Sequence, residues 1–167
     1  MSFSIYDAAM PPMIHMLENL SRILDKTVAQ AETDNISLDA LLEARLAPDM
    51  FAFPRQIQIA TDAAKGCAAR LAGKEPPSFP DEEKTFPELK HRIAKTIAFL
   101  KSIHADQCSG AEDREIVIKT PNRDLRFSGR DYVNNFALPN FYFHVTTAYG
   151  LLRMKGIAIG KMDFLGG

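Results

Sequence analysis

Four long segments of this chain carry apolar side chains at three- and four-residue spacings, which keep them on one face of an α-helix. The first segment shows the pattern with Met10, Met13, Leu17, Leu20, Leu24 and Val28. It predicts a helix over residues 11–31, with Pro11 and Pro12 in the opening turn, where a missing N–H costs little. A helix with one apolar face buries that face against other helices, so the predicted fold class is an all-α four-helix bundle.

The second long helix is predicted over residues 49–73, after a short helix over residues 38–45. Asp49 is expected to cap its beginning, and Gly73 is expected to end it. Its apolar face is formed mostly by small side chains, namely Phe53, Gln56, Ala60, Ala63, Cys67 and Leu71. Gln56 is the polar member of this face, and the small neighbours allow another helix to approach closely.

A proline-rich loop separates the second and third helices. Residues 74–83 contain three prolines, which exclude a regular helix. Thr85 and Glu88 then have the spacing of a capping box and predict the start of the third helix. Its apolar face comprises Leu89, Ile93, Ile97, Leu100 and His104. The acidic side chains at residues 81–83, and Asp62 on the second helix, are expected to be solvated.

The convincing β pattern of the sequence is a small hairpin. Residues 115–119 and 124–128 alternate in polarity around the turn residues Pro121 and Asn122. Two strands alone are marginally stable, so the hairpin is expected to pack on the bundle.

The C-terminal quarter predicts two more helices and an extended tail. A short helix is expected to begin at Ser128, and the Leu138-Pro139 step is expected to break it. The last long helix then covers residues 139–155, with Gly156 as its stop. The tail carries the apolar residues Ile157, Ile159, Phe164 and Leu165, which are expected to lie on the bundle or on a partner.

Composition restricts the classes of function. The 167 residues suit one domain, and the 46% hydrophobic and 25% charged residues are ordinary globular values. The 20 basic and 21 acidic residues are interspersed, which argues against nucleic-acid binding. Neither a signal peptide nor a membrane-spanning segment is expected, and Cys67 and Cys108 lack metal-site spacing. These features predict a cytoplasmic protein without membrane association.

His144 is the leading candidate for a functional residue, because it falls on the inward face of the last helix. There it is either a core histidine with a satisfied hydrogen bond, or a ligand or general base. Thr147 and Tyr149 lie within about a turn and are either its partners or packing residues. Gln56 either bonds to His144 or Tyr149 across the bundle or reaches water. We expect His144 to lie within reach of Gln56, and these four residues form the candidate pocket.

Three stretches of the sequence resemble a known bacterial family. They are SIYDAAMPPMIHMLENL, APDMFAFPRQIQIATDAAKG and PNFYFHVTTAYGLLRMKGIAIGKMDFLG. Together they are similar to a branch, of unknown function, of the DinB-like (YfiT-like) superfamily of metalloenzymes. The resemblance implies an up-down-down-up four-helix bundle that is often dimeric. It also implies kinship with metal-dependent thiol transferases and maleylpyruvate isomerases.

The resemblance carries over to the metal site only in part. Metal-binding members of that superfamily supply one histidine from the second helix and two from the last. His144 matches one of these, whereas Ala148 stands one turn on and Gln56 stands on the second helix. A carboxamide is a poor ligand for a transition metal. No cofactor is therefore expected here, although a divalent metal is what the superfamily implies.

Two functions follow from these observations. The favoured one is a small-ligand-binding or structural, dimeric module without a tightly held metal. The alternative is an enzyme of the thiol-transferase or isomerase type with an altered metal site. A homodimer is predicted in either case, from the resemblance and from the apolar tail at residues 157–165.

Overall fold

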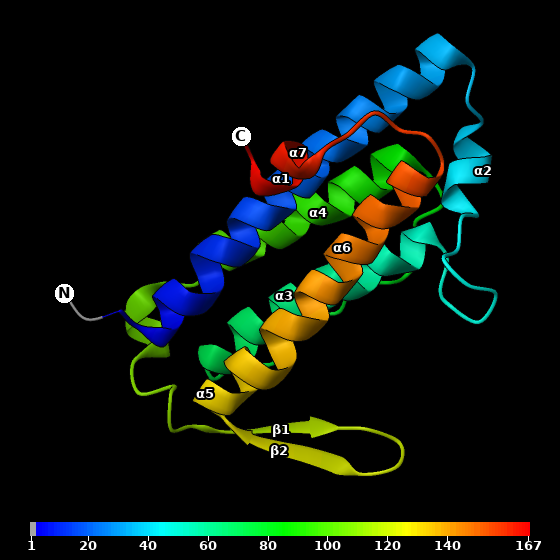
Figure 1. The fold of residues 1–167 in the computed structure, drawn as a ribbon. Helices are drawn as coiled ribbons and strands as arrows, with labels where there is room; N and C mark the ends of the chain where they lie inside the picture. Colours follow the sequence, from blue (N-terminus) through cyan, green and yellow to red (C-terminus); the bar gives the residue numbers. More distant parts are fainter. Residues whose placement is uncertain (1–2) are drawn as a thin grey trace.

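Four long helices lie side by side in the computed structural model, which describes residues 3–167 (Figure 1). They are α1 (Ile5–Asp34), α3 (Phe53–Leu71), α4 (Phe86–Lys101) and α6 (Leu138–Met154). Helices α1 and α6 run in one direction and α3 and α4 in the other (Figure 1), which confirms the predicted up-down-down-up bundle. The shorter helices are α2 (Leu38–Leu42), η1 (Ala105–Cys108), α5 (Gly129–Tyr132), η2 (Val133–Ala137) and α7 (Lys161–Leu165).

The predicted hairpin is confirmed residue for residue. Strands β1 (Glu115–Lys119) and β2 (Asp124–Ser128) pair antiparallel, with Ile116 opposite Phe127. Ile116 is buried in the bundle core, and Phe127 packs against the edge of that core. The hairpin thus leans on the end of the bundle where α6 begins (Figure 1).

The apolar faces of the four helices meet in one continuous core. Among its fully buried members are Met10, Met13, Leu17, Leu20, Phe53, Phe86 and Phe141. The rings of Phe53 and Phe86 lie 5.6 Å apart, so the first turns of α3 and α4 are neighbours. Parallel neighbours need a crossover connection, and the proline-rich residues 74–83 provide it by running back along the bundle.

Helix α1 begins earlier than predicted. Ser4 caps it by accepting from the backbone N–H of Asp7 (3.2 Å), and the Asp7 carboxylate accepts from the backbone N–H of Ser4 (3.0 Å). Pro11 and Pro12 therefore lie inside the helix and not in its opening turn, so that prediction was wrong. Burial of the first turns and the capping box outweigh the two hydrogen bonds that the prolines cannot donate.

Helix α3 begins later than predicted, at Phe53. Ala52 is its N-cap residue and Pro54 lies in its first turn, where a proline fits well. Asp49 is exposed in the preceding turn and caps nothing. Gly73 does follow the end of α3, with φ of +66°, as expected. Helix α2 is also shorter than predicted, since it ends at Leu42.

The crossover loop is held by a buried arginine, which sequence reasoning missed. Arg92 on α4 is 2% exposed. Its guanidinium donates to Asp62 (2.7 Å) and Glu83 (3.1 Å) and pairs with Asp81 (3.0 Å). Its Nε donates to Thr61 Oγ1 (2.7 Å). The prediction of solvation alone was wrong for these three carboxylates, because they pair with a cation buried between α3, α4 and the loop, whereas Glu82 is exposed as expected.

Residues 129–154 form one continuous helical rod, although Leu138-Pro139 was expected to break it. The backbone N–H of Leu138 donates to the carbonyl of Val133, five residues earlier, which makes η2 a π-helical turn. Such a turn changes the bonding pattern directly before Pro139. Pro139 lacks its backbone N–H at a point where the regular i to i−4 hydrogen bonds of the helix are already interrupted. The helix therefore continues through Pro139 into α6.

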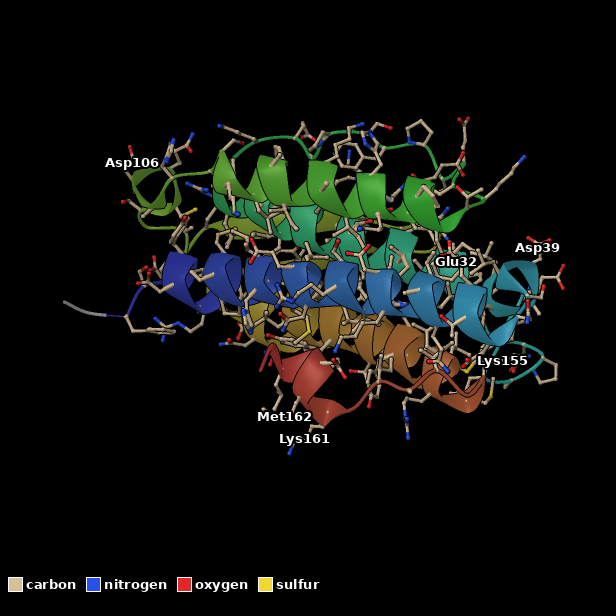
Figure 2. The ribbon with its side chains drawn as sticks, turned by 90° about the horizontal axis from the view of Figure 1, so that it is seen from above. Glu32, Asp39, Asp106, Lys155, Lys161 and Met162 are labelled. Atoms are coloured by element: carbon tan, nitrogen blue, oxygen red, sulfur yellow. The ribbon has the colours of Figure 1, made fainter. Side chains whose placement is uncertain are left out.

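The C-terminal segment folds back onto α1 and is helical at its end, not extended. Ile157 and Ile159 are buried, and the Phe164 ring packs against Tyr149. The Asn19 amide donates to the Phe164 carbonyl (2.9 Å). Figure 2 shows α7 beside α1, with Lys161 and Met162 on its outer side.

Three further features complete the fold. Helix α4 ends at Lys101, so His104 lies outside it, exposed before η1, and not on the apolar face as predicted. Cys67 and Cys108 are buried and free. No helix within residues 3–167 has both the length and the apolar character needed to cross a membrane.

Candidate functional site

His144 and Gln56 meet across the interface of α6 and α3. The Nδ1 atom of His144 lies 2.7 Å from Oε1 of Gln56. His144 is 9% exposed and Gln56 is 1% exposed. The contact expected from the inward faces of the two helices is therefore present in the structure.

The hydrogen bonds of Gln56 determine the tautomer of His144. The amide nitrogen of Gln56 donates to the carbonyl of Phe51 (2.9 Å), which can only accept. The amide oxygen of Gln56 therefore faces the imidazole, and it too can only accept. Nδ1 of His144 must carry the proton. In the neutral ring, Nε2 then holds a lone pair.

The surroundings of His144 favour this neutral form. Burial lowers the pKa of the imidazole below its ordinary value, and the nearby positive charge of Arg55 lowers it further. Both effects penalise the imidazolium. Near neutral pH, His144 therefore presents an unprotonated Nε2.

Nε2 of His144 is accessible from outside the bundle. Nε2 has no hydrogen-bond partner among the described residues. Every buried side-chain nitrogen and oxygen in residues 3–167 has a hydrogen-bond partner, so an atom without a partner is not buried. Nε2 therefore reaches solvent, while Nδ1 is held inside by Gln56. The imidazole is oriented by the protein on one side and open on the other.

One exposed aromatic ring contacts the imidazole, and a second aromatic residue contacts Gln56 through its backbone. The Phe143 ring meets the His144 ring edge to face at 5.1 Å, and Phe143 is 55% exposed. Phe51, which accepts from Gln56 through its carbonyl, is also 55% exposed. The Arg55 guanidinium lies 5.7 Å from the centre of the Phe51 ring. The imidazole is thus next to the apolar ring of Phe143.

Thr147 and Tyr149, the other predicted pocket residues, bond to neither His144 nor Gln56. The Thr147 hydroxyl donates to the Phe143 carbonyl of its own helix (2.7 Å). The Tyr149 ring packs edge to face against Phe164 of α7, with centroids 5.7 Å apart. The structure places Thr147 in helix-internal bonding and Tyr149 under the C-terminal segment.

A pocket of about 180 Å³ lies farther along the groove between α3 and α6. Its walls come from α3, β1, α5, η2 and the first turn of α6: Ile59, Asp62, Ala63, Arg70, Ile118, Tyr132, Phe136, Ala137 and Asn140. Asn140 precedes His144 by one helical turn, so the two residues lie on the same side of α6, although His144 itself does not line the pocket. Sequence reasoning missed Arg70. The available signal was Gly66, a glycine inside a helix four residues before it.

The donor set around His144 does not fit the metal centre that the family resemblance implies. Ala148 offers no ligand, and the Gln56 oxygen is occupied by the proton on Nδ1. Across residues 3–167, no group of three or more His, Cys, Asp or Glu side chains is placed to hold a metal ion. The residues therefore support no chemical step through a three-ligand metal.

The fold defines a class of protein. The structure is similar to the crystal structure of a DinB family member protein from Shewanella denitrificans, with a TM-score of 0.88 and 40% sequence identity. The match covers 97% of this chain and 92% of that one, which identifies a DinB-like helical bundle. The chain belongs to the family described as a domain of unknown function, DUF1993, which it matches over residues 5–165. No curated protein matches the sequence.

Proposed function

We propose that this protein binds a small molecule at His144, with Nε2 of the imidazole accepting a hydrogen bond from the ligand. One observation carries the proposal: the hydrogen bond between Nδ1 of His144 and Oε1 of Gln56. It orients the ring and leaves an unprotonated nitrogen at the surface. The protein satisfies one ring nitrogen and leaves the other to solvent or to a ligand.

The surroundings of Nε2 define the chemistry of the ligand. The accessible nitrogen is an acceptor, so the ligand needs a donor such as a hydroxyl, thiol or amide N–H. The exposed ring of Phe143, which contacts the imidazole, favours an aromatic or other apolar body beside that donor.

Ligand-observed NMR with small aromatic alcohols, thiols and amides tests the proposal. We expect a subset to bind the wild-type protein and to lose binding in His144→Phe, which keeps a ring but removes both nitrogens. His91→Phe is the matched control, because His91 is exposed on α4. Equal binding of the whole set by wild type and His144→Phe would refute the proposal.

The alternative is catalysis of the thiol-transferase or isomerase type. It is supported by the same neutral Nε2, since a general base must be unprotonated and accessible at the working pH. In that case His144 would take a proton from a thiol or from a carbon next to a carbonyl. Turnover of thiol or keto-acid substrates that is lost in His144→Phe but kept in His91→Phe would favour the enzyme over the binding module.

We also propose that the protein is a homodimer, as the family resemblance implies. Ile157 and Ile159 no longer support this, because they are covered by their own bundle. The remaining support is exposed apolar surface on the C-terminal segment, where Met162 is 60% and Leu165 48% exposed. Light scattering should give a dimer for the wild type and a monomer for Met162→Glu. Met154→Glu, at an exposed position on α6, is the control. A wild-type monomer at micromolar concentration would exclude the homodimer.

The proposed location is the cytoplasm. It is supported by two cysteines that are buried and unpaired, since free thiols are typical of a reducing compartment. Fractionation of the producing cells, with detection of the untagged protein, checks this proposal.

A further inference from the structure

We propose that the pocket at the hairpin end of the α3–α6 groove binds a small carboxylate with an apolar body, and that Arg70 holds the carboxylate. This site is distinct from the opening at His144 and does not rest on the function proposed there. Three features of the pocket carry the inference: the way Arg70 is placed, its unpaired charge, and the walls around it.

Gly66 makes room for the Arg70 side chain. A Cβ atom at residue 66 would lie 2.5 Å from Nη1 of Arg70, closer than atoms can approach. The guanidinium therefore lies back along α3 over the position of this glycine, in the direction that helical side chains usually take. Glycine is unfavourable inside a helix. Its presence inside α3, five residues before the end of the helix, is explained by the space that the guanidinium occupies.

The charge of Arg70 has no counterion in the described part of the chain. Its side chain donates one hydrogen bond, from Nη1 to the Tyr132 hydroxyl (3.1 Å), and its guanidinium lies 5.8 Å from the centre of that ring. Burial raises the pKa of Tyr132 to about 12, so this phenol stays neutral and does not balance the cation. None of the ion pairs formed within residues 3–167 involves Arg70. A half-buried guanidinium with free N–H groups is suited to a planar carboxylate.

The walls of the pocket favour a ligand that is apolar apart from its acid group. Ile59 and Ala63 of α3, Ile118 of β1 and Phe136 of η2 supply apolar surface. The carboxylate of Asp62 also lines the pocket, but its Oδ1 is bound by both Lys65 and Arg92. Lys65, together with the Arg92 cation that Asp62 shares with Asp81 and Glu83, therefore reduces the repulsion between Asp62 and an anion beside Arg70.

The size of the pocket limits the ligand to a small molecule. Its volume of about 180 Å³ is close to the liquid volume of roughly six water molecules, which take up roughly 30 Å³ each. A single aromatic ring or a short alkyl chain with a carboxylate is of this order. Asn140, whose side chain has no hydrogen-bond partner within residues 3–167, could bond to a second polar group on such a ligand.

Titration with sodium benzoate, followed by amide NMR shifts, tests the site at constant ionic strength. Benzamide is the probe control, because it has nearly the same shape without the charge. We expect saturable benzoate shifts at residues 59–70, 118 and 136–140, and affinity for benzamide weaker by roughly tenfold, the value of one charge-assisted hydrogen bond. Shifts that do not saturate, or equal affinity for the two probes, would overturn the proposal.

Two variants test the placement of Arg70 without removing it. Gly66→Ala displaces the guanidinium, which is the flexible end of a long side chain, so the fold should persist. Ala63→Leu fills the pocket. Each should weaken benzoate binding by roughly tenfold or more, whereas Arg123→Met, which removes a cation from the exposed hairpin turn, should leave it unchanged. Unchanged binding in both Gly66→Ala and Ala63→Leu would show that benzoate does not use this site.

The outcome at Arg70 is separable from the function of His144. His144→Phe should leave benzoate affinity within about twofold, because the imidazole is not among the residues that line the pocket. Loss of benzoate binding in His144→Phe would show that the two regions form one site and would overturn the assignment of a separate one. Arg70→Met gives the direct loss of binding, and its NMR spectrum reports whether Tyr132 keeps its place.

Discussion

Gln56 on α3 and His144 on α6 satisfy each other across the bundle through one hydrogen bond of 2.7 Å. The Gln56 amide also bonds to the carbonyl of Phe51, which leaves it no freedom to rotate. The histidine that matches one ligand position of the superfamily is therefore held through Nδ1 by a carboxamide. The consequences of this pair for stability and titration can be measured.

The first prediction concerns the coupling of this pair. Replacing either residue leaves a buried polar group of the other unpaired, so His144→Ala and Gln56→Ala should each lower the free energy of unfolding by about 1–3 kcal/mol. The double variant should lose less than the sum of the two, with a coupling of about 1 kcal/mol. Urea denaturation of the four proteins measures the cycle. Additive effects would mean that the two side chains do not interact in solution.

The second prediction concerns pH. The pKa of His144 lies below its ordinary 6.5 in the folded protein, so the unfolded chain binds this proton more readily. The contribution of His144 to the free energy of unfolding is thus complete above pH 6.5, and it declines as the pH falls below that value. Urea unfolding at about pH 7.5 and 5.5 should show a larger loss of stability for the wild type than for His144→Phe. His15, His91 and His104 are common to both proteins and cancel in this difference. A pH dependence that is the same in both proteins would contradict the prediction.

The third prediction concerns the crossover loop. Arg92→Met removes a buried cation and leaves three carboxylates, on Asp62, Asp81 and Glu83, without it. We expect a loss of about 3 kcal/mol in the free energy of unfolding, as for other ion pairs with one buried partner removed. Lys90→Met on the same helix is the control, because its pair with Asp25 is solvent-exposed and should contribute less than about 1 kcal/mol. Similar losses in the two variants would show that burial of Arg92 adds no stability.

The fourth prediction concerns the attachment of the C-terminal segment. Asn19 is fully buried, and its amide donates to the Phe164 carbonyl. Asn19→Ala should speed amide hydrogen exchange in α7, because a local opening that exposes this segment becomes easier. Ser21→Ala, whose hydroxyl makes no hydrogen bond within the described residues, is the control. Exchange in α7 should increase by roughly tenfold in Asn19→Ala alone, the effect of one lost buried hydrogen bond.

The helices and the hairpin could be read from local patterns. The spacing of Leu17, Leu20 and Leu24 indicates a helix in any fold that buries that face, and the alternation in residues 115–119 indicates a strand. The capping box of Thr85 and Glu88 depends on residues three apart and was likewise found where expected. The pattern also placed Gln56 and His144 on inward faces, because periodicity reports burial directly.

The effect of the prolines was predicted wrongly from the sequence, because it depends on the caps and turns that flank each proline in the folded helix. Pro11 and Pro12 are tolerated inside α1 because Ser4 and Asp7 cap an earlier turn. Pro139 continues the rod because a π-helical turn precedes it. In both cases packing of the flanking residues outweighs local propensity, and packing is decided only when the whole bundle forms.

Contacts between segments far apart in the sequence were decided by the tertiary structure alone. The sequence predicts solvated carboxylates at Asp62, Asp81 and Glu83. In the structure, α3, α4 and the crossover loop place all three beside Arg92. The tail at residues 157–165 was expected to lie on the bundle or on a partner, and the structure buries its two isoleucines in the core of its own bundle. The sequence by itself determined which faces are apolar and which residues can be capped. The pairing of buried charges, the tautomer of His144 and the open charge of Arg70 depend on distances between helices, and the tertiary fold alone sets those distances.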